Sequence, residues 1–270
     1  MINRSAAVLG QPVAHSLSPA LHTAGYAAAG LTGWAYTAVE CAEDELAPFV
    51  GGLGPEWAGL SLTMPLKSVA LTVATEVDPL ARALGAANTL VRTDTGWTAY
   101  NTDAPGMTDA LGWAGVTGAQ RIAVLGGGGT ARAALGAARD LGAEVVLYVR
   151  RPEAAEELRP VAHALGVPFV VEGWGRAQDA VTADVVISTA PKGAADALAV
   201  AAWSAETVVF DVVYDPWPTA LAAGAQRAGC RVVSGLDLLL AQGVRQFTLF
   251  TGVDAPVSDM RAALEGAAGR

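Results

Sequence analysis

The chain is poor in the residues that build covalent cross-links and metal sites. Its 270 residues include two cysteines and three histidines. Cys41 and Cys230 are too few for a disulfide framework, and neither has the spacing of a zinc knuckle. His15, His22 and His163 are too scattered to predict a zinc site. The composition therefore predicts no bound metal, and it fits a protein of the reducing cytoplasm.

Charge is also scarce, at 16% of the residues, and positions 5–39 contain no Asp, Glu, Lys or Arg. Gln11, Pro12 and Ser16 interrupt that stretch well before the ~18 apolar residues that a membrane helix needs. The net charge is 17 − 26 = −9, and an acidic surface repels nucleic-acid phosphates. Hydrophobic residues make up 52% of the chain, which excludes disorder. We therefore expect a soluble globular protein that binds neither nucleic acid nor a membrane.

Short apolar runs alternate with alanine-rich stretches, which is typical of parallel strands covered by helices. In the first half we expect strands over 6–10, 34–39, 57–62 and 88–92, and helices over 18–29 and 43–50. The first of these helices should have Ser18 as its N-cap and Pro19 as its first residue. In the second half we expect strands over 121–125, 144–149, 168–171, 184–189, 207–212 and 231–234. Further helices are expected over 130–141, 153–165, 236–250 and 257–267.

This alternation predicts an α/β protein of two domains with a cleft between them. The first is a mainly parallel αβα domain, formed by residues 1–103 plus 238–270. The second is a Rossmann-type dinucleotide-binding domain, formed by residues 104–237. No long linker separates them, so the segments around 101–106 and 235–238 are expected to join them.

A glycine-rich loop lies between the clearest strand and the clearest helix. Gly126, Gly128 and Ala131 fit the pattern G-x-G-x-x-G/A, which provides a tight turn, room for a pyrophosphate and close helix–strand packing. The helix N-terminus then offers free N–H groups to the phosphates. Four consecutive glycines alone would suit a flexible turn. The strand–loop–helix context favours a dinucleotide site instead.

The end of the next strand indicates which dinucleotide is bound. An NAD site usually places Asp or Glu there to bind the ribose 2′-hydroxyl. Here the strand is followed by Arg150 and Arg151, whose guanidinium groups suit a 2′-phosphate. An ordinary solvated arginine pair is the alternative, but the position after the strand favours NADP(H).

Lysine is nearly absent, and this scarcity draws attention to Lys67. The chain has 17 basic residues, of which only Lys67 and Lys192 are lysines. A lysine can release a proton where an arginine cannot, so Lys67 is a candidate proton donor. Asp103 is a carboxylate that could hold Lys67 charged, and Asn88 adds a polar group at another strand end. The alternative for Lys67 is a lysine kept by chance, as at Lys192. The alternative for Asp103 and Asn88 is an ordinary capping or turn role.

Together these motifs resemble the shikimate dehydrogenases, NADP-dependent enzymes of aromatic amino-acid biosynthesis. The resemblance extends over essentially the whole chain and rests on segments 16–19, 63–67, 85–89, 101–103, 126–131, 210–216 and 235–242. It implies that residues 1–103 plus 238–270 bind the substrate and that residues 104–237 bind NADP(H). The implied substrate-binding residues are Ser16, Ser18, Thr63, Lys67, Asn88, Asp103, Tyr214 and Gln242. The two serines would bind the substrate carboxylate, Tyr214 would lie near that carboxylate, and Asn88 would bind the ring hydroxyls.

The resemblance also implies a set of cofactor-binding residues. They are Gly126, Gly127, Gly128, Gly129, Thr130, Ala131, Arg150, Arg151, Thr189, Val212, Gly235 and Leu238. Four positions depart from the family pattern. Ser61 stands where an Asn is common, Val149 replaces an Asn of the nucleotide segment, Ala154 replaces an Arg, and Leu238 replaces a Met. Arg151 is expected to compensate for Ala154.

The implied activity is the reversible reduction of 3-dehydroshikimate to shikimate by NADPH, with Lys67 and Asp103 as catalytic residues. Lys67 would donate a proton to the forming alkoxide, or act mainly as an electrostatic anchor. Alternatives are a broader quinate and shikimate dehydrogenase, or an NADP-binding sensor without catalysis. A methylene-tetrahydrofolate dehydrogenase would share the two-domain plan but lacks the paired-serine loop. We expect a monomer or homodimer.

Overall fold

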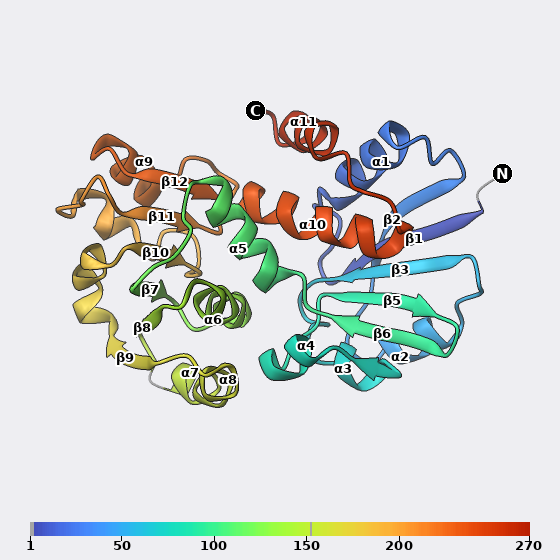
Figure 1. Cartoon of the computed structure of the whole chain (residues 1–270), viewed down its shortest axis with the longest axis horizontal. Helices are drawn as coiled ribbons and strands as arrows, with labels where there is room; N and C mark the ends of the chain where they lie inside the picture. The colour runs from blue at the N-terminus through green and yellow to red at the C-terminus, as the bar shows by residue number, and fades with distance from the viewer. Residues whose placement is uncertain (1–2, 152) are drawn as a thin grey trace. The chain divides into compact units, whose positions relative to one another are not determined.

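The computed structural model describes residues 3–151 and 153–270, and the chain forms two compact units. One consists of Met1–Thr102 with Leu239–Arg270, and the other of Asp103–Leu238. Each unit is built around its own six-stranded sheet (Figure 1). Within the described residues, none of the helices has the length and apolar content to span a membrane.

The sheet of the first unit mixes parallel and antiparallel strands. Its strands are β1 (Arg4–Gly10), β2 (Trp34–Glu40), β3 (Trp57–Leu62), β4 (Glu76–Val77), β5 (Thr89–Thr93) and β6 (Gly96–Tyr100). They lie in the order β2-β1-β3-β5-β6-β4. β1 pairs in parallel with β2 and β3, whereas β5 is antiparallel to both β3 and β6. The predicted strands are confirmed within one or two residues, but β4 and β6 were not predicted.

The first four helices of the first unit alternate with its strands along the sequence, and the last two lie near the end of the chain. They are α1 (Ser18–Ala28), α2 (Leu46–Gly51), α3 (Ala70–Val73), α4 (Pro79–Leu84), α10 (Gly235–Thr251) and α11 (Val257–Ala267), although residues 235–238 of α10 are assigned to the second unit. α1 packs against β2 and α11. One core cluster of this unit is formed by buried side chains such as Leu9, Leu60 and Leu90, each fully shielded from solvent.

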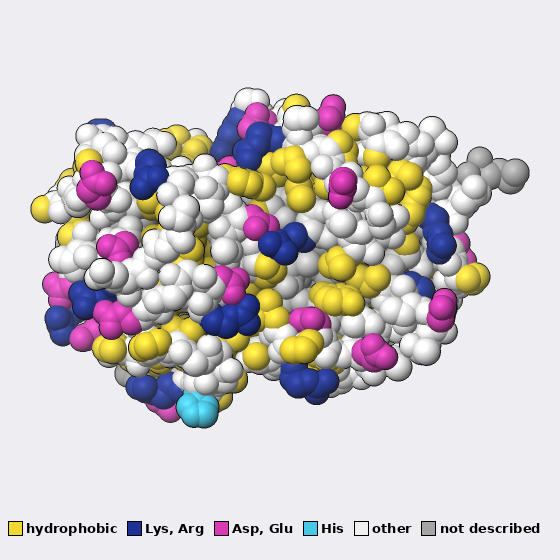
Figure 2. Space-filling view, viewed as in Figure 1, with side chains coloured by type: hydrophobic (Ala, Val, Ile, Leu, Met, Phe, Trp, Pro, Cys, Tyr) yellow, Lys and Arg dark blue, Asp and Glu magenta, His cyan; other side chains and the backbone are white. Residues whose placement is uncertain are grey.

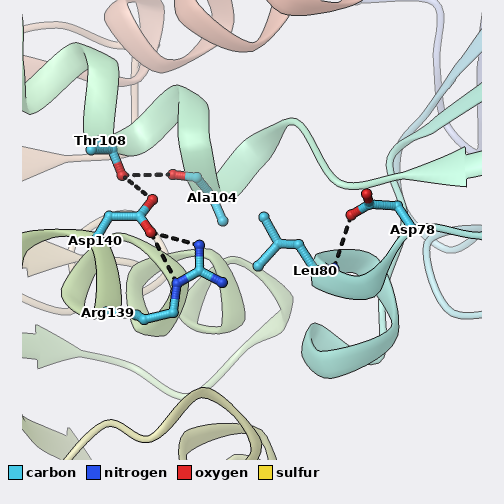
Figure 3. Close-up of polar contacts among 6 residues, drawn as sticks. All are labelled: Asp78, Leu80, Ala104, Thr108, Arg139 and Asp140. Atoms are coloured by element: carbon cyan, nitrogen blue, oxygen red, sulfur yellow. Dashed lines mark hydrogen bonds and ion pairs between the residues drawn. The ribbon is translucent and has the colours of Figure 1, made fainter.

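The predicted N-cap of α1 is wrong by one residue. Leu17 holds the cap position, no side chain among the described residues caps the helix, and Ser18 is already helical. Ser18 is buried within the first turn of the helix. By contrast, α4 has a conventional cap, because Asp78 Oδ2 accepts from the N–H of Leu80 at 2.9 Å (Figure 3).

The second unit has the predicted Rossmann-type sheet. Its strands are β7 (Arg121–Leu125), β8 (Glu144–Val149), β9 (Phe169–Gly173), β10 (Val185–Ser188), β11 (Val208–Asp211) and β12 (Arg231–Ser234). They lie in the order β12-β11-β10-β7-β8-β9, and all five pairs are parallel. This is the doubly wound order. β8 and β9 are added on one side of β7, and β10, β11 and β12 on the other, so the strand order switches between β7 and β10. A ligand crevice is expected at that switch point, outside the carboxyl ends of the strands.

Several helices pack against this sheet. They are α5 (Asp103–Trp113), α6 (Gly129–Leu141), α7 (Glu153–Glu156), α8 (Arg159–Leu165), α9 (Ala220–Arg227), and the 3₁₀ helices η1 (Trp174–Thr182) and η2 (Asp196–Val200). α6 contacts β7, β8, α5 and α8, while α9 contacts β11, β12 and η2. The pairing of α5 with α6 includes a hydrogen bond from Thr108 Oγ1 to Asp140 Oδ2 at 3.2 Å, and Arg139 binds the same carboxylate (Figure 3).

The single helix predicted over 153–165 is wrong, because the structure has two short helices there. α7 ends at Glu156 and α8 begins at Arg159, with Pro160 near its start. A proline inside one continuous helix would lack the N–H that bonds to residue 156, and its ring would clash with that carbonyl. At the start of a helix, the same proline is tolerated.

The charged side chains are interspersed over the face shown in Figure 2. Basic side chains in dark blue lie among acidic ones in magenta, with white and yellow groups between them. This mixture on the face shown is typical of an ordinary hydrated surface.

Candidate active site

The glycine-rich loop begins with a turn that requires glycine. Gly126 follows β7 and has φ +95°, and a Cβ there would lie 3.0 Å from the backbone N and Cα of Ala190. The loop is held in place because the Gly126 N–H donates to the Tyr148 carbonyl at 3.0 Å. Thr189 Oγ1 also donates to the Gly126 carbonyl at 3.0 Å. The first glycine therefore has the tight-turn role that the motif predicts.

The next glycines leave open space at the start of α6. Gly128 is the N-cap residue of this helix, and no described side chain caps it. A Cβ at Gly128 or Gly129 would meet nothing within 4 Å. Thr130 follows in the first turn, and Ala131 is buried at 1% exposure. The helix thus presents uncapped N–H groups next to free space, which fits the phosphates of a dinucleotide.

A pocket of about 250 Å³ lies beside this loop, within the second unit. Six of the predicted cofactor residues line it: Gly126, Gly127, Gly128, Arg150, Arg151 and Thr189. None of its described lining residues is acidic. The fit to a nucleotide with a 2′-phosphate is therefore good, because two guanidinium groups share the pocket with the phosphate loop.

Some pocket residues were not identified from the sequence. Trp174, Ala190, Pro191 and Ala194 also line the pocket. Trp174 directly follows β9, the neighbour of β8 in the sheet, so strand order would have indicated it. Val149, the departure from the family Asn, lines the pocket too. The side chain of Ala154 lies outside the described part of the structure.

The remaining predicted cofactor residues lie elsewhere in the same unit. Val212 follows β11, and Gly235 and Leu238 belong to the first turn of α10. They are not among the residues that line the pocket. Val212 and Gly235 lie against each other, because a Cβ at Gly235 would sit 2.0 Å from the Val212 carbonyl oxygen. Gly235 is therefore required by close approach of two backbone segments.

In the first unit, predicted substrate residues gather at one edge of the sheet. Thr63 and Lys67 follow β3, and Asn88 precedes β5. Because β5 runs antiparallel to β3, its start lies next to the end of β3, and the Leu62 N–H donates to the Asn88 carbonyl at 2.7 Å. The Ala87 N–H donates to the Lys67 carbonyl at 2.7 Å, which ties the loop bearing Lys67 to the residue before Asn88.

The loop after β1 is joined to the same edge. A Cβ at Gly10 would lie 2.3 Å from Thr63 Cγ2, and the Gln11 N–H donates to the Met64 carbonyl at 2.9 Å. The predicted serines lie further along this loop, where the Ser18 N–H donates to Ser16 Oγ at 3.3 Å. Close backbone contact therefore brings the loops after β1 and β3 together.

The side chain of Asn88, a predicted substrate residue, is held by several hydrogen bonds. Its Oδ1 accepts from the Thr102 N–H at 2.7 Å, and its Nδ2 donates to Thr102 Oγ1 at 2.9 Å. The same Nδ2 lies 3.4 Å from Oε1 of Gln242 on α10. The structure thus brings two predicted residues, 154 positions apart, into direct contact.

Two predicted substrate residues belong to the second unit. Asp103 is the first residue of α5, where a carboxylate is stabilised by the helix dipole. Tyr214 follows β11, and burial raises the pKa of its phenol. The Tyr214 hydroxyl is therefore a neutral hydrogen-bond group at physiological pH.

Ser61 shows how the chain accommodates one departure from the family pattern. It is 4% exposed, accepts a hydrogen bond from the Tyr36 hydroxyl at 2.6 Å and donates to Gln246 Oε1 at 2.7 Å. Gln246 on α10 thus places a side-chain amide beside Ser61. Gln246 was not predicted as a site residue, although a glutamine four residues after Gln242 lies on the same helix face.

His22 is a core residue rather than a site residue. Its ring stacks on Tyr36 with a centroid distance of 4.2 Å and an interplanar angle of 3°. Burial lowers the pKa of His22 to about 3, and the neighbouring Gln246 opposes this shift only in part. Within the described residues no group of three His, Cys, Asp or Glu side chains could hold a metal ion.

These features define a class, the dinucleotide-dependent dehydrogenases that combine a Rossmann-type unit with a second α/β unit. Models of two shikimate dehydrogenase domains match the chain, the substrate-binding domain over residues 8–90 and the C-terminal domain over residues 235–265. The C-terminal domain of alanine dehydrogenase/PNT matches residues 94–215.

Full-length relatives support the same family. An NADP(+)-dependent shikimate dehydrogenase of Moorella thermoacetica is 38% identical, over 97% of this chain and 93% of its own length. The crystal structure of Mycobacterium tuberculosis shikimate dehydrogenase is 44% identical with a TM-score of 0.87, covering 97% of this chain and 99% of that one. A Thermus thermophilus structure in complex with NADP(H) and shikimate is 32% identical with a TM-score of 0.84, covering 98% and 99%. The chain belongs to the shikimate dehydrogenase family.

Proposed function

We propose that the protein catalyses the reversible NADPH-dependent reduction of 3-dehydroshikimate to shikimate in aromatic amino-acid biosynthesis. The observation that carries this proposal is the contact between Asn88 and Gln242, 3.4 Å apart. The family resemblance assigns both residues to the substrate. Relatives that are 38% and 40% identical over 97% of the chain, and that are named NADP(+)-dependent shikimate dehydrogenases, support it further.

The second unit provides the residues that would hold NADP(H). The uncapped start of α6 would bind the pyrophosphate, and Arg150 and Arg151 would bind the 2′-phosphate. Trp174 would offer a flat apolar wall within the same pocket. When bound, NADPH supplies the hydride for the carbonyl carbon. Val212, Gly235 and Leu238 would contact the cofactor outside the pocket.

Lys67 and Asp103 would perform the proton chemistry. The protonated Lys67 amine would donate its proton to the carbonyl oxygen as negative charge develops there, completing the new hydroxyl group. Asp103 would accept a hydrogen bond from the same hydroxyl and orient the Lys67 amine. In the reverse oxidation the amine would take that proton back from the substrate hydroxyl.

The remaining polar residues would orient the substrate. The Ser16 and Ser18 hydroxyls and the neutral Tyr214 phenol would bind the carboxylate, and Thr63, Asn88 and Gln242 the ring. Holding the ring at both ends restricts its orientation, which accounts for much of the acceleration in a reaction of two bound molecules. We assign residues 1–103 plus 238–270 to substrate binding and residues 104–237 to the nucleotide, in a cytoplasmic monomer or homodimer.

The test is a turnover assay with a substrate panel. Purified protein is mixed with 3-dehydroshikimate and NADPH, and in parallel with shikimate or quinate and NADP⁺, while nicotinamide absorbance is followed. We expect turnover of 3-dehydroshikimate and shikimate, with much lower kcat/KM for quinate. Absence of turnover with both shikimate compounds would refute the proposal, and equal kcat/KM for quinate would widen the substrate range.

A further inference from the structure

A buried polar network runs through the core of the first unit and ends at Asn88. It consists of Tyr36, Ser61, Gln246, Thr89, Asn88 and Thr102. Each of these side chains is at most 6% exposed. They come from β2, β3, α10, β5 and the segments beside β5 and α5, so separate parts of the chain build one continuous set of hydrogen bonds.

The direction of these hydrogen bonds is set by Tyr36. Burial raises the pKa of its phenol far above the ordinary range, so the hydroxyl keeps its proton and donates to Ser61 Oγ at 2.6 Å. Ser61 then donates to Gln246 Oε1 at 2.7 Å. Because a side-chain carbonyl oxygen only accepts, the Gln246 amide must face Ser61 with its oxygen and the opposite side with its nitrogen.

The nitrogen of Gln246 is directed at β5. Nε2 donates to Thr89 Oγ1 at 3.0 Å and to the Asn88 carbonyl at 3.2 Å. Since the Thr89 hydroxyl accepts from Gln246, its own hydrogen is free to bond to Asn88 Oδ1, 3.0 Å away. Gln246 therefore contacts Asn88 directly, at its backbone carbonyl, and indirectly, through the Thr89 hydroxyl.

The Asn88 amide is left with only one possible orientation. Its Oδ1 receives the Thr102 N–H at 2.7 Å as well as the Thr89 hydroxyl, and the Thr102 N–H, which can only donate, would face an amide N–H if the side chain were turned over. Its Nδ2 therefore points to Thr102 Oγ1 and, at 3.4 Å, to Gln242 Oε1. This second contact places an amide N–H beside a carbonyl oxygen, a pairing that a hydroxyl group could bridge because it both accepts and donates.

We propose that Gln246 is a positioning residue for the substrate, which acts by orienting Asn88 through Thr89 so that the Asn88–Gln242 pair binds a ring hydroxyl. This inference rests on the proposed function. It assigns a role to a residue that need not touch the substrate. It also gives a reason for serine at position 61, because its short hydroxyl accepts from Tyr36 and donates to the Gln246 amide oxygen.

The variant Gln246→Met removes the amide and keeps the length of the side chain. We expect it to raise KM for shikimate about tenfold, the effect of about one hydrogen bond to a poorly oriented group, with a smaller change in kcat. KM for NADP⁺ should stay unchanged, since the nucleotide pocket belongs to the other unit. Thr251→Val is the matched control, because it removes a hydrogen bond to Phe247 on the same helix. It should leave KM for shikimate unchanged.

A double-mutant cycle separates positioning from a general loss of packing. In an Asn88→Ala background, Gln246→Met should not raise KM for shikimate further, because the group that it orients is already gone. Equal effects of Gln246→Met in both backgrounds, or an equal effect of Thr251→Val, would overturn the inference. Gln246→Glu, which retains the acceptor but lacks the Nε2 donor, should reproduce the loss if the methionine variant folds poorly.

Hydrogen exchange provides a readout that needs no substrate. The Thr102 amide donates to Asn88 Oδ1, so release of the Asn88 side chain in Gln246→Met should speed its exchange about tenfold. Unchanged exchange at Thr102 would overturn the inference. If the wild-type protein turned over no shikimate compound, the proposed function would fail, and the Thr102 measurement would still decide whether Gln246 orients Asn88.

Discussion

His22 should make the stability of the protein fall in mild acid, and the size of the effect follows from its burial. Its pKa is lowered from 6.5 to about 3 in the folded state. Between these values the unfolded chain binds a proton that the folded chain does not, so stability decreases as the pH falls. The slope approaches about 1.4 kcal/mol per pH unit. From pH 7 to pH 5 the loss from this group is about 2 kcal/mol, and below about pH 3 it levels off.

The assay is urea unfolding at pH 7 and pH 5, followed by circular dichroism at constant ionic strength. His22→Phe keeps an aromatic ring against Tyr36 and removes the titrating group, so its pH-dependent loss should be about 2 kcal/mol smaller than in wild type. Tyr26→Phe is the control, since it changes the same aromatic cluster but keeps His22, and its loss should equal that of wild type. The same pH dependence in wild type and His22→Phe would refute the reasoning.

Three other predictions concern the proposed catalytic and nucleotide residues. Lys67→Ala and Lys67→Arg should each lower kcat about 10²- to 10⁴-fold in the absorbance assay, and retention of most of kcat by both would remove Lys67 from the chemical step. Arg150→Ala should raise the Kd of NADPH at least tenfold in a fluorescence titration and leave that of NADH nearly unchanged; equal losses would contradict the 2′-phosphate assignment. Gly126→Ala should lower stability by about 1–3 kcal/mol in urea unfolding, because it forces a Cβ against the Ala190 backbone at positive φ. Gly128→Ala, where a Cβ meets nothing, should keep wild-type stability yet weaken NADPH binding; equal destabilisation by both would contradict this account.

Several parts of the fold could be predicted because their cause is local. The parallel strands of the second unit are buried on both faces, so β7, β8 and β12 are apolar runs whose bounds follow from the sequence. The phosphate loop could be predicted equally well, since Gly126 adopts a positive φ that almost no other residue tolerates. Local patterns failed where a short or mixed segment depends on its neighbours, as in β6, which completes a hairpin with β5.

The amino-acid sequence by itself determined the alternation of strands and helices, the glycine turn and the arginine pair after β8, because propensity, periodicity and turn chemistry act between close neighbours in the chain. Only the tertiary structure decided that Trp174 shares a pocket with those arginines, and that Gln246 reaches Ser61 across 185 positions. Hydrogen bonds between distant segments depend on the direction in which each side chain leaves its element, and that direction exists only once the sheet and its helices have packed.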